Sequence, residues 1–281
     1  MNGNKITAAM FFFAVFSLLW HATLSARPIP EGDIENYSGR GSDYLLKGEF
    51  DKAIAEFNQA ITLIRSDPKP QAKYAPTFYN RGAAYAFKGN MQQALSDFEE
   101  AVKVDPNYIL AYYRRADLYQ KMGRLDEALA DYNAIVKLNP DQTHAYNNRG
   151  LIYNLKGEYD LAINEFDKAL KINPKFINAY YNRGLANLDK KDFFQAKVDL
   201  NRELELSPNS FNANHFYLAV SYFCDKQYDQ SWDEVDALQA GGFTISPVFL
   251  EELKKIPRSK KKTAPADPIK KSGWGEQDDT W

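Results

Sequence analysis

The sequence predicts an all-α protein built from stacked pairs of antiparallel helices, and three observations lead to this fold class. Small and aromatic residues recur at helical spacings. Glycines recur where the first helix of each pair is expected to end. A fixed period of 34 residues runs through the chain and is clearest in four prolines: Pro106, Pro140, Pro174 and Pro208. Such a period indicates repeats that stack on one another, because a single helix pair cannot bury both of its faces.

Each repeat divides into two helices with matching stripes. In the fourth repeat, Tyr146, Gly150 and Tyr153 share one face of the first helix, because spacings of four and three keep a helical face. Ala162 and Phe166 lie on the facing stripe of the second helix. Small residues let the helices approach closely, and aromatic rings fill the gaps beside them. The first helices are expected to end in left-handed caps at four glycines: Gly48, Gly89, Gly123 and Gly157.

This pattern resembles the tetratricopeptide repeat, a helix–turn–helix unit of 34 residues. Small residues keep the period at two places: Gly82, Ala116, Gly150 and Gly184 at the eighth residue of a unit, and Ala94, Ala128, Ala162 and Ala196 at the twentieth. The resemblance covers residues 34–240, with units that begin near residues 34, 75, 109, 143, 177 and 212. It implies a right-handed α-solenoid of five to six tetratricopeptide helix–turn–helix repeats, whose first helices line a concave groove.

Some units depart from the pattern. Unit two begins 41 residues after unit one, and the extra residues fall around residues 66–73, where two prolines argue for a loop. Unit five has Lys191 at the place of the capping glycine, and unit six keeps the key places only loosely. The sequence therefore leaves open whether the sixth repeat is complete.

The two ends of the chain differ from the repeats. Residues 1–26 carry a lysine, then an apolar run, then small residues, which is the order of a secretory signal peptide. We therefore expect a periplasmic or secreted protein, or a membrane-anchored one if the signal is not cleaved. Residues 27–33 form a leader. Residues 241–257 are predicted as a C-terminal capping helix with Ser246 as N-cap and Pro247 in its first turn. Residues 258–281 are predicted as a disordered basic tail.

The sequence contains no catalytic or metal-binding pattern. Of its three histidines, His144 and His215 are far apart and lie outside any spacing of metal ligands. Cys224 is the only cysteine, which excludes an intramolecular disulfide and a thiolate cluster, and on a helix it is expected as a small buried residue. The net charge of −2 gives no argument for nucleic acid. We therefore expect a protein that is not an enzyme and that holds no metal or cofactor.

Five arginines occupy the seventh place of units one to five, and an acid occupies the twenty-third place of the same units. The arginines are Arg40, Arg81, Arg115, Arg149 and Arg183, and the acids are Glu56, Asp97, Asp131, Glu165 and Asp199, in the same order. An arginine can bury its methylene stem while its guanidinium pairs with a carboxylate of the facing helix. We therefore predict structural Arg–acid pairs, with binding of a polyanion by the arginines as the alternative.

Places 2, 5, 6, 9, 12 and 13 of the first helices are expected to face the groove, and the candidate binding residues are those at the fifth and sixth places of units two to five. These two places hold Tyr79, Asn80, Tyr113, Arg114, Asn147, Asn148, Tyr181 and Asn182. Asparagine is a middling-to-poor helix former, so helix propensity does not explain its recurrence at the sixth place. In some tetratricopeptide proteins, asparagines at this place bind a peptide backbone, and the resemblance implies the same role here, although Arg114 interrupts the row. Tyrosine is enriched in binding sites. These eight residues are the predicted peptide-binding groove, with ordinary solvated side chains as the alternative.

The sequence thus favours an adaptor or scaffold of the cell envelope that binds an extended or helical segment of another protein. One alternative is a glycan- or cell-wall-binding module, in which the groove tyrosines stack on sugar rings. A second alternative is a non-catalytic subunit of an envelope enzyme complex. Two further interactions stay open: weak contact of the basic tail with an anionic envelope surface, and a homodimer formed through the imperfect sixth unit.

Overall fold

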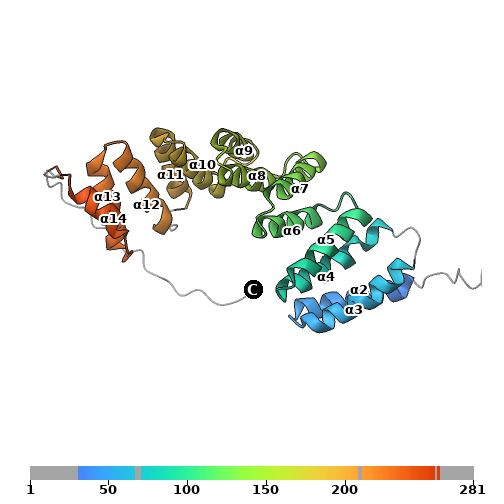
Figure 1. Cartoon of the computed structure of the whole chain (residues 1–281). Coiled ribbons are helices and arrows are strands. Elements are labelled where there is room, and N and C mark those ends of the chain that lie inside the picture. Colours follow the sequence, from blue (N-terminus) through green and yellow to red (C-terminus); the bar gives the residue numbers. More distant parts are fainter. Residues whose placement is uncertain (1–30, 67–70, 208–210, 257, 260–281) are drawn as a thin grey trace, which may run out of the picture. The chain divides into compact units, whose positions relative to one another are not determined.

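The computed structural model describes residues 31–66, 71–207, 211–256 and 258–259. Within these ranges every regular element is helical, and the helices follow one another in antiparallel pairs (Figure 1). The elements are α2 (Glu31–Leu46), α3 (Phe50–Arg65), the 3-10 helix η1 (Ala72–Tyr74), α4 (Ala75–Phe87), α5 (Met91–Val104), α6 (Ile109–Lys121), α7 (Leu125–Leu138), α8 (Thr143–Leu155), α9 (Tyr159–Ile172), α10 (Ile177–Asp189), α11 (Phe193–Leu206), α12 (Phe211–Cys224), α13 (Tyr228–Ala240) and α14 (Pro247–Lys254). The predicted signal peptide and almost all of the predicted basic tail lie outside the described residues.

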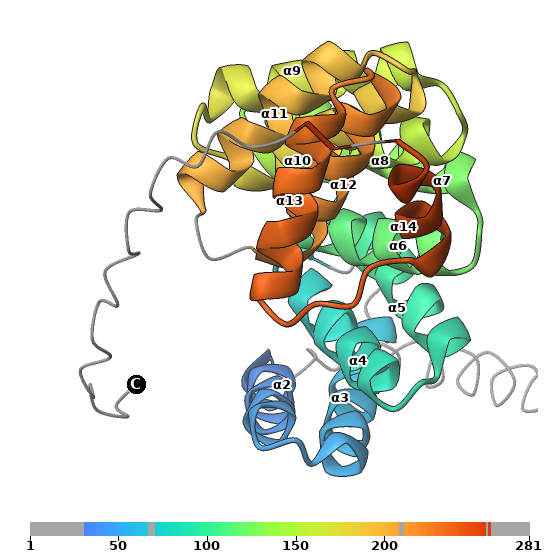
Figure 2. The same cartoon turned by 90° about the vertical axis from the view of Figure 1, so that its left-hand side faces the viewer.

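The chain divides into two compact units, residues 1–152 and residues 153–281, with the boundary inside α8. In the first unit α2 packs on α3, α4 on α5 and α6 on α7, and the pairs stack through α3 with α4 and α5 with α6. In the second unit α9 to α13 pack in the same consecutive way, and Figure 2 shows α12 and α13 side by side. The predicted all-α fold of paired helices is confirmed. The handedness of the complete array stays a prediction.

First helices of consecutive pairs also lie next to each other, since α2 contacts α4 and α10 contacts α12. Four of the six first helices begin where the repeat boundaries place them, at residues 75, 109, 143 and 177. α12 begins one residue early, at Phe211, and forms a complete pair with α13. α2 begins at Glu31, so the last three residues of the predicted leader are helical. The acidic residues Glu31 and Asp33 favour a helix start, because negative charge is stabilised at a helix N-terminus.

A tight turn connects the two helices of each pair. In the first four pairs the turn residue is a glycine in the left-handed region, with φ of 73° at Gly48, 81° at Gly89, 72° at Gly123 and 76° at Gly157. The next two pairs keep this backbone with a lysine, with φ of 68° at Lys191 and 60° at Lys226. A residue with a Cβ atom is strained in this region. In unit five the turn residue is therefore a lysine instead of a glycine, but the backbone conformation of the turn is the same.

The eighth place of a unit is small because the facing helix puts a ring against it. A Cβ atom added at Gly41 of α2 would lie 2.6 Å from Cε1 of Phe57 on α3. At Gly82 of α4 it would lie 2.8 Å from Cε1 of Phe98 on α5. Both rings are fully buried. The close approach of the two helices thus depends on the missing side chain.

The substitution Gly41→Ala is expected to lower the free energy of unfolding by about 1–3 kcal/mol, because the new methyl group displaces the Phe57 ring. Gly39→Ala is the matched control on the same helix, where an added Cβ meets nothing within 4 Å. There the better helix propensity of alanine should raise stability by up to about 1 kcal/mol. Urea denaturation of both variants checks the pair, and changes of the same sign would contradict the close approach.

A short helix covers the last pair. α14 begins after Ser246 with Pro247 at its first position, as predicted, but the Ser246 hydroxyl makes no capping hydrogen bond. Leu253 is fully buried and packs with residues of α12, α13 and the connection before α14, whereas Val248 of the same helix is 71% exposed. No helix in the described ranges is long and apolar enough to cross a lipid bilayer.

Candidate functional site

The arginines of the seventh place bind carboxylates of the facing helix in a two-pronged geometry. Nε and Nη2 of Arg81 donate to the two oxygens of Asp97, at 2.8 and 2.5 Å. The same fork joins Arg115 to Asp131 and Arg183 to Asp199. Arg40 also bonds Glu56, through a single carboxylate oxygen. The structure thus brings together four of the five predicted pairs: Arg40–Glu56, Arg81–Asp97, Arg115–Asp131 and Arg183–Asp199.

Arg149 lies in the first of the two compact units of the chain and Glu165 in the second. The fifth predicted pair, Arg149 with Glu165, therefore stays a prediction. Within its own unit Arg149 donates Nη1 to the Asn133 side-chain oxygen at 2.7 Å. Within the other unit Glu165 accepts from Lys168 at 2.7 Å.

Several arginines also reach the preceding repeat, which the sequence reasoning missed. Nη1 of Arg81 donates to Asn58 at 2.7 Å, and Nη1 of Arg183 donates to Asp167. Asn58, Asn133 and Asp167 all hold the twenty-fifth place of the unit before the arginine. The recurrence of a polar residue at this place was the available signal. Each such arginine therefore joins the two helices of its own repeat and fastens the repeat to its neighbour.

Burial raises the pKa of the paired acids Asp97, Asp131 and Asp199, and the hydrogen bonds from their arginines act in the opposite direction. These three residues are at most 3% exposed. A buried charge is costly unless it is paired, so the arginines are required by the fold. Their use in these pairs weakens the alternative of a polyanion site.

Arg81→Ala is expected to cost about 3–5 kcal/mol near neutral pH, because it leaves the Asp97 charge buried and unpaired. Since the folded-state pKa of Asp97 is raised, its favourable contribution is present below the unfolded pKa and is lost as pH rises through the folded pKa. The loss of unfolding free energy caused by Arg81→Ala should therefore become smaller as pH falls toward about 4. Chemical denaturation at several pH values measures it.

Arg40→Ala is the matched control for this prediction, because the Arg40 side chain is 43% exposed and its partner is reachable by water. A smaller loss with little pH dependence is expected there. Equal losses in the two variants would show that burial of the acid does not set the importance of the pair.

The predicted groove tyrosines pack against rings of neighbouring helices. The ring pairs, with distances between centroids, are Tyr79–Tyr108 at 5.5 Å, Tyr113–Tyr132 at 6.1 Å and Tyr181–Tyr217 at 6.1 Å. Burial raises the pKa of both Tyr113 and Tyr181 to about 12. These rings contribute to packing within a repeat, as Tyr113 on Tyr132, and between repeats, as Tyr181 on Tyr217, which leaves less of their surface for stacking on sugars.

The asparagines of unit four form part of an internal hydrogen-bond network. Asn148 donates Nδ2 to the hydroxyl of the fully buried Tyr132 at 3.2 Å. The same hydroxyl contacts carboxylate and amide oxygens of Asp117 and Gln120, at 3.2 and 3.1 Å. Asn147 donates to Asn148 at 3.3 Å and is only 4% exposed. The expectation that Asn147 offers its amide to a ligand is therefore wrong, because the fold encloses this side chain and uses its hydrogen bonds.

An open cleft of about 200 Å³ lies between α4 and α6, and we call it the α4–α6 cleft. Its apolar wall consists of Ala83, Ala86, Phe87, Phe98 and Leu118, and its charged rim of Arg114, Asp117 and Lys121. Phe87 is 71% exposed, although one face of its ring stacks on Phe50 at 5.2 Å between centroids. The cleft therefore combines exposed apolar surface with charge of both signs.

A second opening of about 320 Å³, the α2–α4 cleft, is lined by apolar side chains and by several hydrogen-bonding ones. Ser38 and Thr77 share a hydroxyl–hydroxyl bond of 2.9 Å, and the Ser42 hydroxyl donates to the backbone oxygen of Ser38 and accepts from Nδ2 of Asn80 at 3.3 Å. Among the described residues, no hydrogen bond reaches the side-chain carbonyl oxygen of Asn80. This cleft therefore offers the Asn80 oxygen to a ligand as a hydrogen-bond acceptor.

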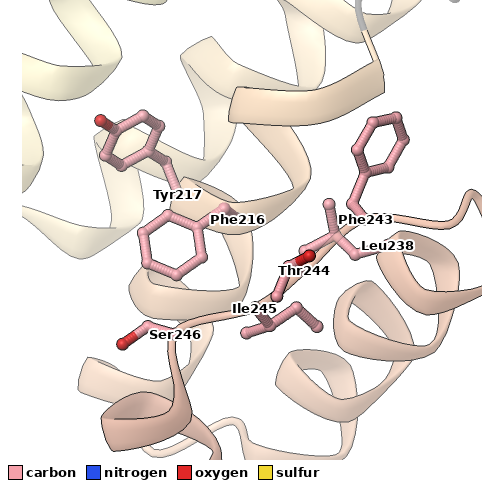
Figure 3. Close-up of a pocket in the computed structure, with 7 residues that line it drawn as sticks. All are labelled: Phe216, Tyr217, Leu238, Phe243, Thr244, Ile245 and Ser246. Atoms are coloured by element: carbon pink, nitrogen blue, oxygen red, sulfur yellow. The ribbon is translucent and has the colours of Figure 1, made fainter.

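The third opening, the terminal pocket, lies in the second unit and has a volume of about 380 Å³ (Figure 3). Phe216 and Tyr217 of α12 form one side, Leu238 of α13 lies opposite, and residues 243–246 of the following connection complete the wall. All seven lining residues are uncharged. The pocket suits an apolar group, with the hydroxyls of Thr244 and Ser246 nearby.

Models of the tetratricopeptide repeat match residues 34–67, 75–108 and 113–175. A solved tetratricopeptide repeat protein from Parabacteroides merdae ATCC 43184 is 22% identical, with a TM-score of 0.64, over 79% of this chain and 84% of that chain. The chain contains tetratricopeptide repeats. MamA from Desulfovibrio magneticus RS-1 is 24% identical, with a TM-score of 0.56, over 63% of this chain and 96% of that chain.

YrrB, described as a tetratricopeptide protein with an unusual peptide-binding site, is 21% identical, with a TM-score of 0.54, over 65% of this chain and 94% of that chain. At these identities the likeness to solved structures establishes the fold alone. No curated protein matches the sequence significantly. Tetratricopeptide repeats mediate protein–protein interactions and bind protein or peptide partners.

In this tetratricopeptide array, the open surfaces coincide only partly with the predicted groove residues. Asn80 lines the α2–α4 cleft and Arg114 lines the α4–α6 cleft, while Asn182 is half-buried on α10. Phe87 and Lys121 hold the thirteenth place of their units, which was expected to face the groove, but the sequence reasoning did not select them as binding residues. The signal was a large apolar residue at this place, two residues before the capping glycine: Leu46 is 87% exposed, Phe87 71% and Leu155 70%.

Within the part of the chain that the structure describes, no group of three or more His, Cys, Asp or Glu side chains is placed to hold a metal ion. His215 Nδ1 lies 2.5 Å from a carboxylate oxygen of Glu234, which links α12 to α13. Cys224 is exposed, so its expected burial is wrong, since it ends α12 rather than facing the next helix.

Proposed function

We propose that this tetratricopeptide-repeat protein is a non-enzymatic adaptor that holds a segment of a partner protein against its first helices. The observation that carries this proposal is the α4–α6 cleft, where exposed Phe87 borders an apolar wall with a charged rim. Exposed apolar surface ringed by polar groups is typical of protein contact sites. The peptide-binding site in the name of YrrB, which shares the fold, gives further support.

We infer that the adaptor works in the cell envelope, as residues 1–26 have the order of a signal peptide. The glycan-binding alternative has less support, because the three groove tyrosines share ring contacts with neighbouring helices. The alternative of a non-catalytic enzyme subunit is a special case of the adaptor, since it also needs a docked partner segment.

A photo-crosslinking residue at position 87 is expected to capture the partner in intact cells, because the Phe87 side chain borders the cleft. The matched control is the same residue at Gln93, which is exposed on the second helix α5. Ala83→Trp in the background of the position-87 probe should abolish capture, because the indole fills the cleft. Mass spectrometry of the adducts measures both effects. Equal capture from position 93, or capture that survives Ala83→Trp, would rule out the cleft as the docking site.

Export is tested by the mass of the mature chain after expression in a Gram-negative host. Cleavage after Ser25 or Ala26 is expected, with the product in the periplasmic fraction. Val15→Arg should block export, because it places a charge in the apolar run of the signal. If the protein is absent from the periplasmic fraction and keeps its N-terminal residues, the envelope location is contradicted.

A further inference from the structure

Two clefts border the same helix, α4. Pro76, Asn80, Ala83 and Phe87 follow one another at spacings of four, three and four, so they share one face of this helix. The first half of the stripe borders the α2–α4 cleft, and the second half borders the α4–α6 cleft. A ligand that crosses α4 therefore meets the Asn80 acceptor in the first cleft, and exposed Phe87 with the charged rim in the second.

The distances along α4 fit a short stretch of peptide. Asn80 and Phe87 are seven residues apart, which corresponds to about 10 Å along a helix axis. Four extended residues span about 13 Å. One continuous segment of extended peptide can therefore use both clefts at once, without a fold of its own.

The charges at the α4–α6 cleft favour an acidic neighbour for the apolar group. Lys121 forms no ion pair with any described residue, so its charge is available. Arg114 makes only long contacts, 3.4 Å to the Tyr79 hydroxyl and 3.8 Å to Asp117. Asp117 is the only acid on the rim, and it also accepts a hydrogen bond from Tyr132. The rim therefore carries two cationic side chains and one carboxylate that is already hydrogen-bonded, so its net charge is positive.

We propose that the face of α4 recognises an extended peptide in which small polar residues lie on one side of an apolar residue and acids lie on the other. The apolar side chain enters the α4–α6 cleft beside Phe87. Its acidic neighbours face Lys121 and Arg114, and the polar residues donate hydrogen bonds to the side-chain oxygen of Asn80. This site rests on the proposed adaptor function and adds the chemistry of the partner segment.

The test uses the purified full chain and three fluorescent peptides that differ at defined positions. The probe, acetyl-GTSGLDDG-amide, carries small polar residues, one leucine and two acids. In the first comparison peptide both acids are replaced by lysine, and in the second the leucine is replaced by glycine. Fluorescence anisotropy is expected to show binding of the probe about tenfold tighter than either comparison peptide, with a loss of affinity at high salt.

Lys121→Glu should weaken binding of the probe about fivefold and strengthen binding of the lysine peptide, because it reverses the sign of the rim. Lys137→Glu on the second helix α7 makes the same charge change at an exposed site and should leave both affinities unchanged. Asn80→Ala should weaken the acidic and the lysine peptides by the same factor, about threefold, because the amide contacts the polar half. Circular dichroism confirms that each variant is folded.

Failure of the proposed peptide preference can be distinguished from failure of the adaptor function. If the three peptides bind equally, or if Lys121→Glu and Lys137→Glu behave alike, the acidic–apolar preference is refuted, while capture from position 87 can still support the adaptor. If capture from position 87 is also absent, the adaptor function itself fails. Tighter binding of the lysine peptide would overturn the assignment of charge.

Discussion

A bidentate pair of arginine and carboxylate inside the helix pair is the interaction on which the rest of the structure depends. The acids Asp97, Asp131 and Asp199 are at most 3% exposed, and an ionised carboxylate at such a depth is unfavourable unless a cation and hydrogen bonds satisfy it. The planar guanidinium of Arg81 donates two hydrogen bonds to the Asp97 carboxylate, and its third nitrogen donates to Asn58 of the preceding repeat. One side chain thereby fixes the spacing within a repeat and the contact between repeats.

This arrangement decides which side chains remain for binding. The rings at the fifth place pack within and between repeats, and Asn148 supplies a partner to the buried hydroxyl of Tyr132, so residue types usually associated with recognition are largely occupied by the fold. The surface left open lies farther along the first helices, where Phe87 and Lys121 border the α4–α6 cleft. We therefore propose that binding depends on apolar area and rim charge more than on a row of amides.

The sequence predicted those features that repeat with the period. Helix starts, left-handed turns and the Arg–acid pairs follow from local geometry and from the need to pair buried charge. The exposed fraction of a side chain does not repeat with the period, because it depends on which side chains of the neighbouring helices lie beside it. The twenty-fourth place holds Phe98, Tyr132, Phe166 and Leu200 in successive units. Only the tyrosine brings a hydroxyl that needs partners, so Asn148 is drawn into a network that periodicity alone could not reveal.

The thirteenth place shows why the open apolar surface is better explained by binding than by folding. It holds Leu46, Phe87 and Leu155 in three units, all at least 70% exposed, but Lys121 and Asp189 in two others. Because charged residues occupy the same helical position in α6 and α10, the repeat does not need an apolar side chain there. Exposed apolar groups add little to stability and favour association. Their presence on the first helices therefore supports the proposed contact with a partner protein.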